Sequence, residues 1–332
     1  MRFGLSLPHY GFSLPTGQIA FADAAGWARR AEDLGFDSVW VSDHFFYSFA
    51  RYGAHPSPIA SLEPLATLAG IAVLTDRVRL GTLVLCAAFR HPALLAKAAT
   101  SIDLLSGGRL DLGLGAGWME EEFDAFGYRF RAPGERFAVL EETVEVVQEL
   151  FVGGPISREG PNVTLREAVL APAPDRPPPV WLGGKGGPRL LRLAARRADG
   201  WNMVWRISPE AYAQKVSDVR EACEAEDRDP ATLGLSIGLY SLTGEDEAAA
   251  RAAFERGRAA APGDAMTGDD YDSWRADTLS GTPEQVLERV AAFEALGVQE
   301  IIVAPWVLPF AIHEPEHVDL FAERVIAPAR GT

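Results

Sequence analysis

Short apolar runs alternate along the chain with longer segments of helical period, which is the pattern of consecutive βα units. Each run is short enough for a strand and is followed by polar or glycine-containing positions. The predicted strands are Phe3–Leu7, Ser38–Val41, Arg79–Leu85, Leu110–Leu114, Val180–Leu182, Gly200–Val204, Leu233–Leu239 and Glu300–Val303.

Segments rich in Ala, Leu, Arg and Glu follow nearly every strand. Glycine in Leu34-Gly35 and Leu296-Gly297 indicates C-caps, because a residue without Cβ enters the left-handed region at low cost. Thr282-Pro283 indicates an N-cap followed by proline at the first helical position. The predicted helices are Gln18–Leu34, Leu62–Leu74, Ala93–Leu105, Phe137–Phe151, Pro188–Ala198, Pro209–Glu226, Pro283–Leu296 and His317–Val325.

Consecutive βα units with right-handed crossovers predict an α/β fold, a closed (β/α)8 TIM barrel formed by one domain over residues 1–332. An open doubly wound sheet is the alternative. Residues 43–61, 115–136 and 256–281 exceed a minimal barrel, and such long loops are usually functional or disordered. The first two are expected on the carboxyl face, where barrel active sites lie, and residues 256–281 are a candidate lid.

Composition narrows the range of partners. The chain is 48% hydrophobic with a net charge of −15, whereas nucleic acids and anionic membranes require a basic surface. No apolar run is long enough to span a bilayer, and the first residues are strand-like and unlike a signal peptide. Cys86 and Cys223 suggest no disulfide framework. We therefore expect a cytoplasmic protein with neither a nucleic-acid nor a membrane partner.

The second predicted strand ends in Asp43-His44, which places an acid and an imidazole at its carboxyl end. This position favours catalysis. The alternative is that Asp43 caps the loop and His44 is an ordinary hydrogen-bonded histidine. Because side chains alternate along a strand, the two are expected to point apart unless the loop bends.

Two glycine-rich segments also leave predicted strands. In Leu112–Trp118 the glycines would let a flat ring approach the backbone, but no third glycine opens a helix at the spacing of a dinucleotide fingerprint. In Val180–Pro188 a strand runs into glycines and a proline-started helix. The amides of Gly186 and Gly187, with Lys185 and the helix dipole, suit a phosphate. A plain flexible turn is the alternative.

The sequence contains no HExxH, CxxC or GxSxG element, so neither a metal site nor serine hydrolysis is indicated. His9 ends the first predicted strand and is a candidate substrate contact. The other scattered histidines are expected to be structural.

The order of these segments resembles that of the luciferase-like flavin and deazaflavin oxidoreductases. The likeness covers about residues 1–205 and the final βα unit. It rests on Asp43-His44, Leu80-Gly81-Thr82, Arg90-His91-Pro92-Ala93, Ser106–Arg109, Gly115–Trp118, Gly183–Pro188 and Ala198–Asn202, in this order.

The resemblance implies that an isoalloxazine-type ring binds on the carboxyl face, with its phosphate at the Lys185–Gly187 turn. His44 would be a proton carrier beside the ring, and a non-proline cis peptide is expected at Leu83–Val84. Cys86 departs from relatives, which often have a small hydroxyl residue or glycine there. The implied cofactor contacts are Asp43, Leu83, Val84, Cys86, Gly117, Trp118, Glu121, Gly184, Lys185, Gly186 and Gly187; the implied substrate contacts are His9, Tyr10 and Trp205.

Asp-His and Gly-Ala-Gly-Trp followed by acids favour the deazaflavin branch, and therefore coenzyme F420 over FMN. The expected reaction is hydride transfer between F420 and a small organic substrate, with Asp43 and His44 in the catalytic centre. One alternative is an FMN-dependent monooxygenase that consumes O2 and receives reduced flavin from a partner reductase. Another is a non-catalytic flavin-binding protein. Resemblance to relatives also implies a homodimer.

Overall fold

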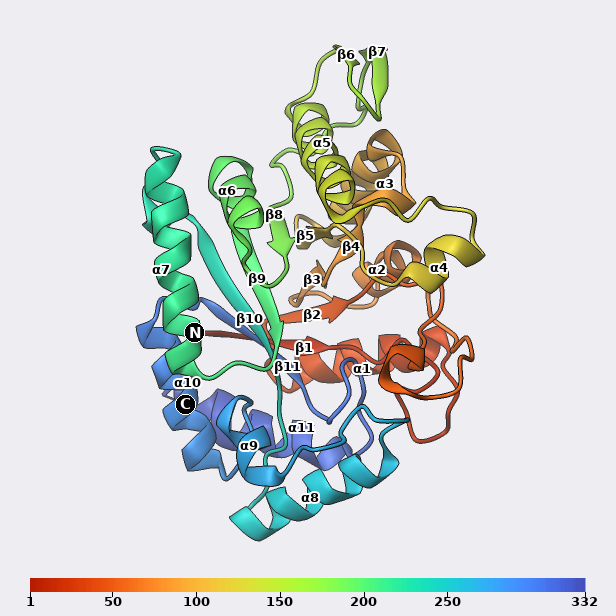
Figure 1. The fold of residues 1–332 in the computed structure, drawn as a ribbon. Helices are drawn as coiled ribbons and strands as arrows, with labels where there is room; N and C mark the ends of the chain where they lie inside the picture. Colours follow the sequence, from red (N-terminus) through yellow and green to blue (C-terminus); the bar gives the residue numbers. More distant parts are fainter. Residues whose placement is uncertain (332) are drawn as a thin grey trace.

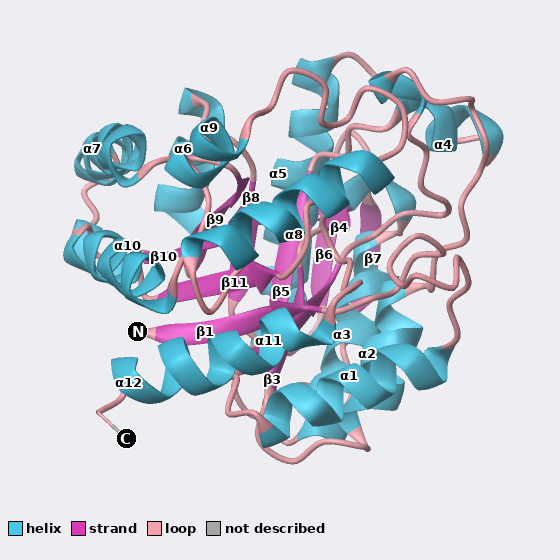
Figure 2. Ribbon diagram, turned by 90° about the horizontal axis from the view of Figure 1, so that it is seen from below, coloured by secondary structure: helices cyan, strands magenta, loops and turns pink. Residues whose placement is uncertain are grey.

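A computed structural model describes residues 1–331 and shows a barrel of parallel strands enclosed by helices (Figures 1 and 2). β3 pairs with both β2 and β5, which joins the two sides of the sheet and closes it. The predicted TIM barrel is confirmed, and the open-sheet alternative is wrong. The barrel strands are β1 (Arg2–Ser6), β2 (Ser38–Val41), β3 (Arg79–Thr82), β4 (Leu85–Cys86), β5 (Leu110–Gly115), β8 (Val180–Gly183), β9 (Gly200–Trp205), β10 (Gly234–Tyr240) and β11 (Glu300–Ala304).

The third predicted strand is interrupted into β3 and β4 by the expected cis peptide at Leu83–Val84. The Val84 side chain packs over backbone of the neighbouring strands. A Cβ added to Gly115 or Gly183 would lie 2.6 Å from it. The segment between β3 and β4 and these glycines therefore fit each other, and substituting either glycine would displace Val84. A second non-proline cis peptide, at Val204–Trp205, was not predicted.

The predicted helices are present, with ends that differ by a few residues. Gly35 and Gly297 have φ of 86° and 91°, as the predicted C-caps require. The Thr282 hydroxyl accepts the amide hydrogen of Gln285 as an N-cap. The last helix continues into a π-helical stretch, η4 (Ala322–Ile326), and α12 (Ala327–Ala329). The others are α1 (Phe21–Asp33), α2 (Pro64–Ala72), α3 (Pro92–Ser106), α5 (Pro133–Val152), α6 (Pro188–Arg197), α7 (Pro209–Ala225), α10 (Pro283–Ala295) and α11 (Pro315–Phe321).

Several short elements were not predicted. Residues 256–281 are only partly a loop, because α8 extends into them and α9 lies within them. Side chains of Asp246 and Asp270 cap these two helices, and the α9 residue Trp274 is buried. The unpredicted elements are α4 (Glu120–Ala125), α8 (Glu247–Ala260), α9 (Tyr271–Ala276), the hairpin β6 (Ile156–Glu159) and β7 (Thr164–Ala168), and the short turns η1 (Ala50–Tyr52), η2 (Ala87–Phe89) and η3 (Pro230–Thr232). Within residues 1–331, none of the helices has the length and apolarity to cross a membrane.

The amino end of the barrel is closed by a buried polar network below Trp40. The Trp40 indole donates to the Ser38 hydroxyl at 2.7 Å, and Ser38 donates to Glu300. Arg2 donates to the other carboxylate oxygen of Glu300 at 3.1 Å. Burial raises the pKa of Glu300, and these partners oppose that effect. These buried side chains occupy the amino end of the barrel, opposite the carboxyl end where the predicted site lies.

Gly113→Ala tests the tight contact between β3 and β5. A Cβ at Gly113 would lie 2.0 Å from the Thr82 carbonyl oxygen. We expect the variant to lose about 1–3 kcal/mol of unfolding free energy in urea denaturation. In the control, Gly26→Ala within α1, the new methyl meets nothing within 4 Å, and helix propensity adds about 0.5–1 kcal/mol. Equal stability of Gly113→Ala and the wild type would contradict the observed packing.

Candidate functional site

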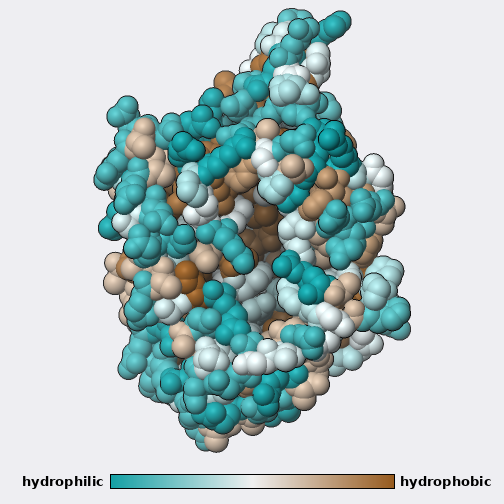
Figure 3. Space-filling view, in the orientation of Figure 1, coloured by the Kyte–Doolittle hydropathy of each residue, from teal (hydrophilic) through white to brown (hydrophobic). Residues whose placement is uncertain are grey.

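The predicted chemistry lies at the carboxyl end of the barrel. Asp43 and His44 follow β2, and the glycine turn follows β8. Because all barrel strands are parallel, these segments share one rim, separated in the strand order by β5 and the β3–β4 position. Figure 3 shows a hollow with apolar surface at its bottom, in the area where Figure 1 draws the arrowheads of β2, β8 and β9.

His44 is paired with a carboxylate that was not predicted. Its Nδ1 lies 2.9 Å from Oε1 of Glu122, whose Oε2 accepts the Phe45 amide hydrogen at 3.0 Å. The Glu122 side chain is 2% exposed and that of His44 10%. Within residues 1–331, Nε2 of His44 has no hydrogen-bonding partner, and it is not among the fully buried unpaired atoms. This nitrogen is therefore accessible to a ligand.

The prediction chose Glu121, which lies on the exposed face of α4. Because Glu120, Glu121 and Glu122 are three consecutive acids, the sequence alone does not show which of them is buried. A helical period at this segment would have placed Glu122 beside buried Phe123, on the inner face. That period was the available signal.

Asp43 points away from His44, as alternation predicted. Its carboxylate accepts two hydrogen bonds from Arg90, at 2.5 and 3.0 Å, and one from the Cys86 amide at 2.9 Å. Arg90 also binds Glu63 at 2.6 Å. Burial alone lowers the pKa of Arg90, but the bonds to Asp43 outweigh burial and raise it. Asp43 therefore ties the loop after β2 to β4 and the start of α3.

Cys86 lies beneath this ion pair and is buried. Burial raises the pKa of its thiol to about 12, so the thiol remains protonated at neutral pH. A Cβ on Gly117 would lie 2.6 Å from its sulfur. Cys86 thus contributes shape and a weak donor, not a thiolate.

His9 and Tyr10, the predicted substrate contacts after β1, have no exposed surface. Nδ1 of His9 donates to the Leu7 carbonyl at 2.8 Å, and Nε2 accepts the Ser42 amide hydrogen at 3.1 Å. The Tyr10 hydroxyl bonds to that of Ser42. Burial lowers the pKa of His9 to about 3. These side chains join the ends of β1 and β2 beneath His44.

Aromatic rings surround His44. The ring centroids of Tyr10, Tyr47 and Trp118 lie 6.0, 5.4 and 5.6 Å from that of His44. Trp118 is 41% exposed, and the guanidinium of Arg51 lies 4.8 Å from its ring centroid. A group bound at Nε2 of His44 therefore lies next to apolar ring surface.

The third predicted substrate contact, Trp205, ends β9 beneath the segment 256–281. It packs against Phe310 and Tyr240, with centroids at 5.3 and 5.7 Å, and Tyr240 stacks on Trp274 of α9. The next residue, Arg206, binds Asp269 and Asp277. These contacts hold α9 against the rim.

The glycine turn has the features of an anion site. Within residues 1–331, the amides of Lys185, Gly186 and Gly187 have no acceptor, whereas Gly184 donates to the Asn202 carbonyl at 3.1 Å. Lys185 is exposed and Gly186 has φ of 70°. A Cβ on Gly186 would lie 3.3 Å from the side chain of Lys215 in α7. Lys215 was not predicted; its spacing in the sequence gave no signal of this proximity.

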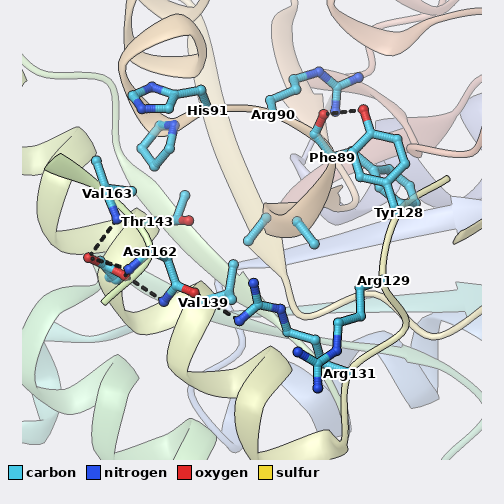
Figure 4. A pocket seen from close by; sticks show the side chains of 14 residues that line it. Phe89, Arg90, His91, Tyr128, Arg129, Arg131, Val139, Thr143, Asn162 and Val163 are labelled. Atoms are coloured by element: carbon cyan, nitrogen blue, oxygen red, sulfur yellow. Dashed lines mark hydrogen bonds between the residues drawn. The ribbon is translucent and has the colours of Figure 1, made fainter. Parts of the chain in front are cut away.

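The cavity drawn in Figure 4 lies beside the rim and includes none of the predicted cofactor or substrate contacts. It has a volume of about 410 Å³ between η2, α5 and the β6–β7 hairpin. Arg131 in its wall donates to Asn162 at 2.9 Å. Across residues 1–331, no group of three or more His, Cys, Asp or Glu side chains is arranged to hold a metal ion.

The buried, neutral His9 predicts a loss of stability in acid. In the unfolded chain His9 gains a proton below its ordinary pKa of about 6.5, whereas in the folded protein it does not until about pH 3. Stability is therefore complete above pH 6.5 and falls as the pH drops towards 3. Between pH 7 and pH 5 the free energy of unfolding falls by about 2 kcal/mol because of His9.

Urea denaturation of the wild type and His9→Gln at both pH values measures this loss. The wild type should lose about 2 kcal/mol more than His9→Gln. An identical loss in the two proteins would show that His9 does not carry the effect.

Comparison with known proteins gives matches over most of the chain. The family model described as "Luciferase-like monooxygenase" matches residues 1–300. An F420-dependent glucose-6-phosphate dehydrogenase of Amycolatopsis mediterranei is 35% identical over 66% of this chain and 64% of its own length, so the match spans less than two thirds of that relative. The enzyme of the same name from Rhodococcus erythropolis is 32% identical over 88% of this chain and 81% of its own length. The structure of an F420-dependent secondary alcohol dehydrogenase with an F420-acetone adduct has a TM-score of 0.80 at 21% identity, covering 98% of both chains.

Proposed function

The chain belongs to the luciferase-like monooxygenase family, and from this premise we propose that it is an oxidoreductase that transfers a hydride between coenzyme F420 and a small organic substrate. The observation that carries the proposal is the shared rim, which holds both an accessible His44 nitrogen and free amides beside Lys185. The names of the relatives from Amycolatopsis and Rhodococcus support F420 over FMN.

The residues at the turn fit a phosphate group. Amides of Lys185, Gly186 and Gly187 would donate to it, and the ammonium group of Lys185 would balance its charge. The stem of Lys215 lies beside the turn, but its ammonium group is paired with Asp218 at 3.0 Å. The segment from the end of β3 through β4 and the segment after β5 lie between this turn and His44 in the strand order. We assign Leu83, Val84, Cys86, Gly117 and Trp118 to the ring-binding surface on this basis, and exposed Glu121 to its rim.

When bound, F420 supplies the carbon that accepts or donates the hydride. Nε2 of His44 takes the hydroxyl proton when an alcohol is oxidised, and returns a proton when a carbonyl or imine is reduced. Asp43 holds the loop through Arg90, and we propose that it positions His44 without moving a proton. The surrounding rings exclude water, and we propose that Trp205 and the 256–281 segment close the substrate side.

Binding of each cofactor to the purified protein tests the choice of coenzyme. We expect F420 to bind and FMN to bind weakly in titrations followed by fluorescence. Tight FMN binding without affinity for F420 would overturn the choice.

Lys185→Ala tests the phosphate site. Loss of one exposed charge should weaken F420 binding about 2- to 5-fold. Binding of the deazaflavin fragment that lacks the phosphate should not change. Lys97→Ala is the matched control, because Lys97 lies on α3 and bonds to the Ala171 carbonyl. Equal weakening for both ligands would mean that Lys185 does not contact the phosphate.

The description of the family model favours a monooxygenase as a second candidate. We propose that such an enzyme would use FMN reduced by a partner reductase. Oxygen consumption with reduced FMN, but no hydride transfer with F420, would establish it. If neither cofactor supports turnover over a broad substrate panel, the non-catalytic flavin-binding alternative is favoured.

We also propose a cytoplasmic homodimer. The two cysteines are free and buried, which suits a reducing compartment. Exposed apolar side chains lie at the end of α2 and at both ends of α3, and exposed apolar surface is typical of subunit contacts. They are Val73, Leu74, Leu94, Leu104 and Leu105. Light scattering of the purified chain measures the subunit count.

A further inference from the structure

We propose that Glu122 is a positioning residue that fixes the tautomer of His44, so that Nε2 is the nitrogen that exchanges the substrate proton. This inference rests on the proposed function, because it assigns a partner to the proposed proton carrier. Glu122 itself touches neither substrate nor cofactor in this assignment.

The hydrogen-bond chemistry sets the tautomer. An ionised carboxylate only accepts hydrogen bonds, so the ring nitrogen beside it must carry the hydrogen. Oε1 of Glu122 lies 2.9 Å from Nδ1 of His44. Neutral His44 is therefore the Nδ1–H form, and its lone pair is on Nε2, the accessible nitrogen.

The carboxylate is held in place from both sides. Its second oxygen accepts the Phe45 amide hydrogen at 3.0 Å, so it cannot rotate without losing one of two bonds. Glu122 is 2% exposed, which removes water as a replacement partner. Exposed Glu120 and Glu121 on the same helix have neither constraint.

Other ionisable groups surround the pair without bonding to His44. His9 and Tyr10 lie beneath the ring, after β1, and both are committed to Ser42. Tyr47 packs against the ring, and Arg51 lies over Trp118. Asp43 is neutralised by Arg90, as described above. Glu122 is thus the one carboxylate within residues 1–331 that bonds to the imidazole.

The assignment gives a balanced step. In the oxidation of an alcohol, the C–H bond breaks with its electron pair and the hydride goes to F420. The O–H bond breaks, its proton goes to Nε2, and the carbonyl double bond forms. His44 becomes an imidazolium, and the adjacent Glu122 carboxylate stabilises that charge. The reverse sequence reduces a carbonyl.

The tautomer is measurable without cofactor or turnover. Long-range proton–nitrogen NMR spectra distinguish Nδ1–H from Nε2–H, and His44→Ala identifies the signal among the six histidines. We expect Nδ1–H in the wild type. Glu122→Gln leaves one acceptor oxygen for two donors and Glu122→Ala leaves none, so the Nε2–H fraction should rise in that order. An unchanged tautomer in both variants overturns the proposal.

The pH profile of F420-dependent oxidation gives the second readout. His44→Ala should lower kcat about 10²–10⁴-fold, the usual contribution of general acid–base catalysis. Glu122→Gln should lower kcat by less, with little change in KM, and move the acidic limb of the profile to lower pH, because the imidazolium loses its counter-charge. Glu122→Asp keeps the charge and should restore the limb. Glu120→Gln, on the exposed face of α4, should match the wild type.

A uniform loss of rate in Glu122→Gln, with the acidic limb unmoved, would reduce Glu122 to a structural role and overturn the proposal. Absence of turnover in the wild type would instead refute the proposed function. Even if the wild type shows no turnover, the NMR spectra still test whether Glu122 fixes the tautomer of His44.

Discussion

Closure of the parallel sheet through the pairing of β3 with β5 is the constraint on which the rest of the structure depends. Leu80 of β3 pairs with Leu110 of β5, and the other edge of β3 pairs with β2. Closure of a parallel sheet brings every carboxyl end to one rim. Segments far apart in sequence, the loop after β2 and the turn after β8, therefore face the same hollow.

Most of the charged side chains described at this rim form ion pairs with each other. Asp43 is neutralised by Arg90, and Arg206 is held by Asp269 and Asp277. Two features remain available to a ligand, Nε2 of His44 and the amides beside Lys185. In a chain with a net charge of −15, a local cation next to free amides is needed to hold an anion, because the average field repels it.

Local pattern was enough for much of the fold. Buried parallel strands require continuous apolar runs, and those runs located every barrel strand. The cis peptide at Leu83–Val84 followed from the family resemblance, since apolar pattern carries no information on peptide isomers. The hairpin β6–β7 was missed because half of its positions are exposed. The helix α8 was also missed; most of it precedes residues 256–281, and only its last turn lies inside the region interpreted as a loop.

The position of the site could be predicted from the sequence, but the residues that contact its functional groups were harder to predict. Asp43 and His44 were identified, and their divergence followed from strand alternation. Glu122 was not identified, because it is one of three consecutive acids, and Lys215 was not, because its contact with the distant glycine turn has no signal in sequence spacing. His9 was interpreted as a substrate contact because it follows a strand, yet Ser42 and the Leu7 carbonyl occupy both of its nitrogens.

The most direct test of the central claim is a crystal structure of the protein with F420 bound. We expect the phosphate to lie against the amides of Gly186 and Gly187, and the ring to lie on the same rim, within reach of a substrate that contacts His44. Density for the phosphate away from the glycine turn, or a ring that leaves His44 on the far side of the hollow, would contradict it.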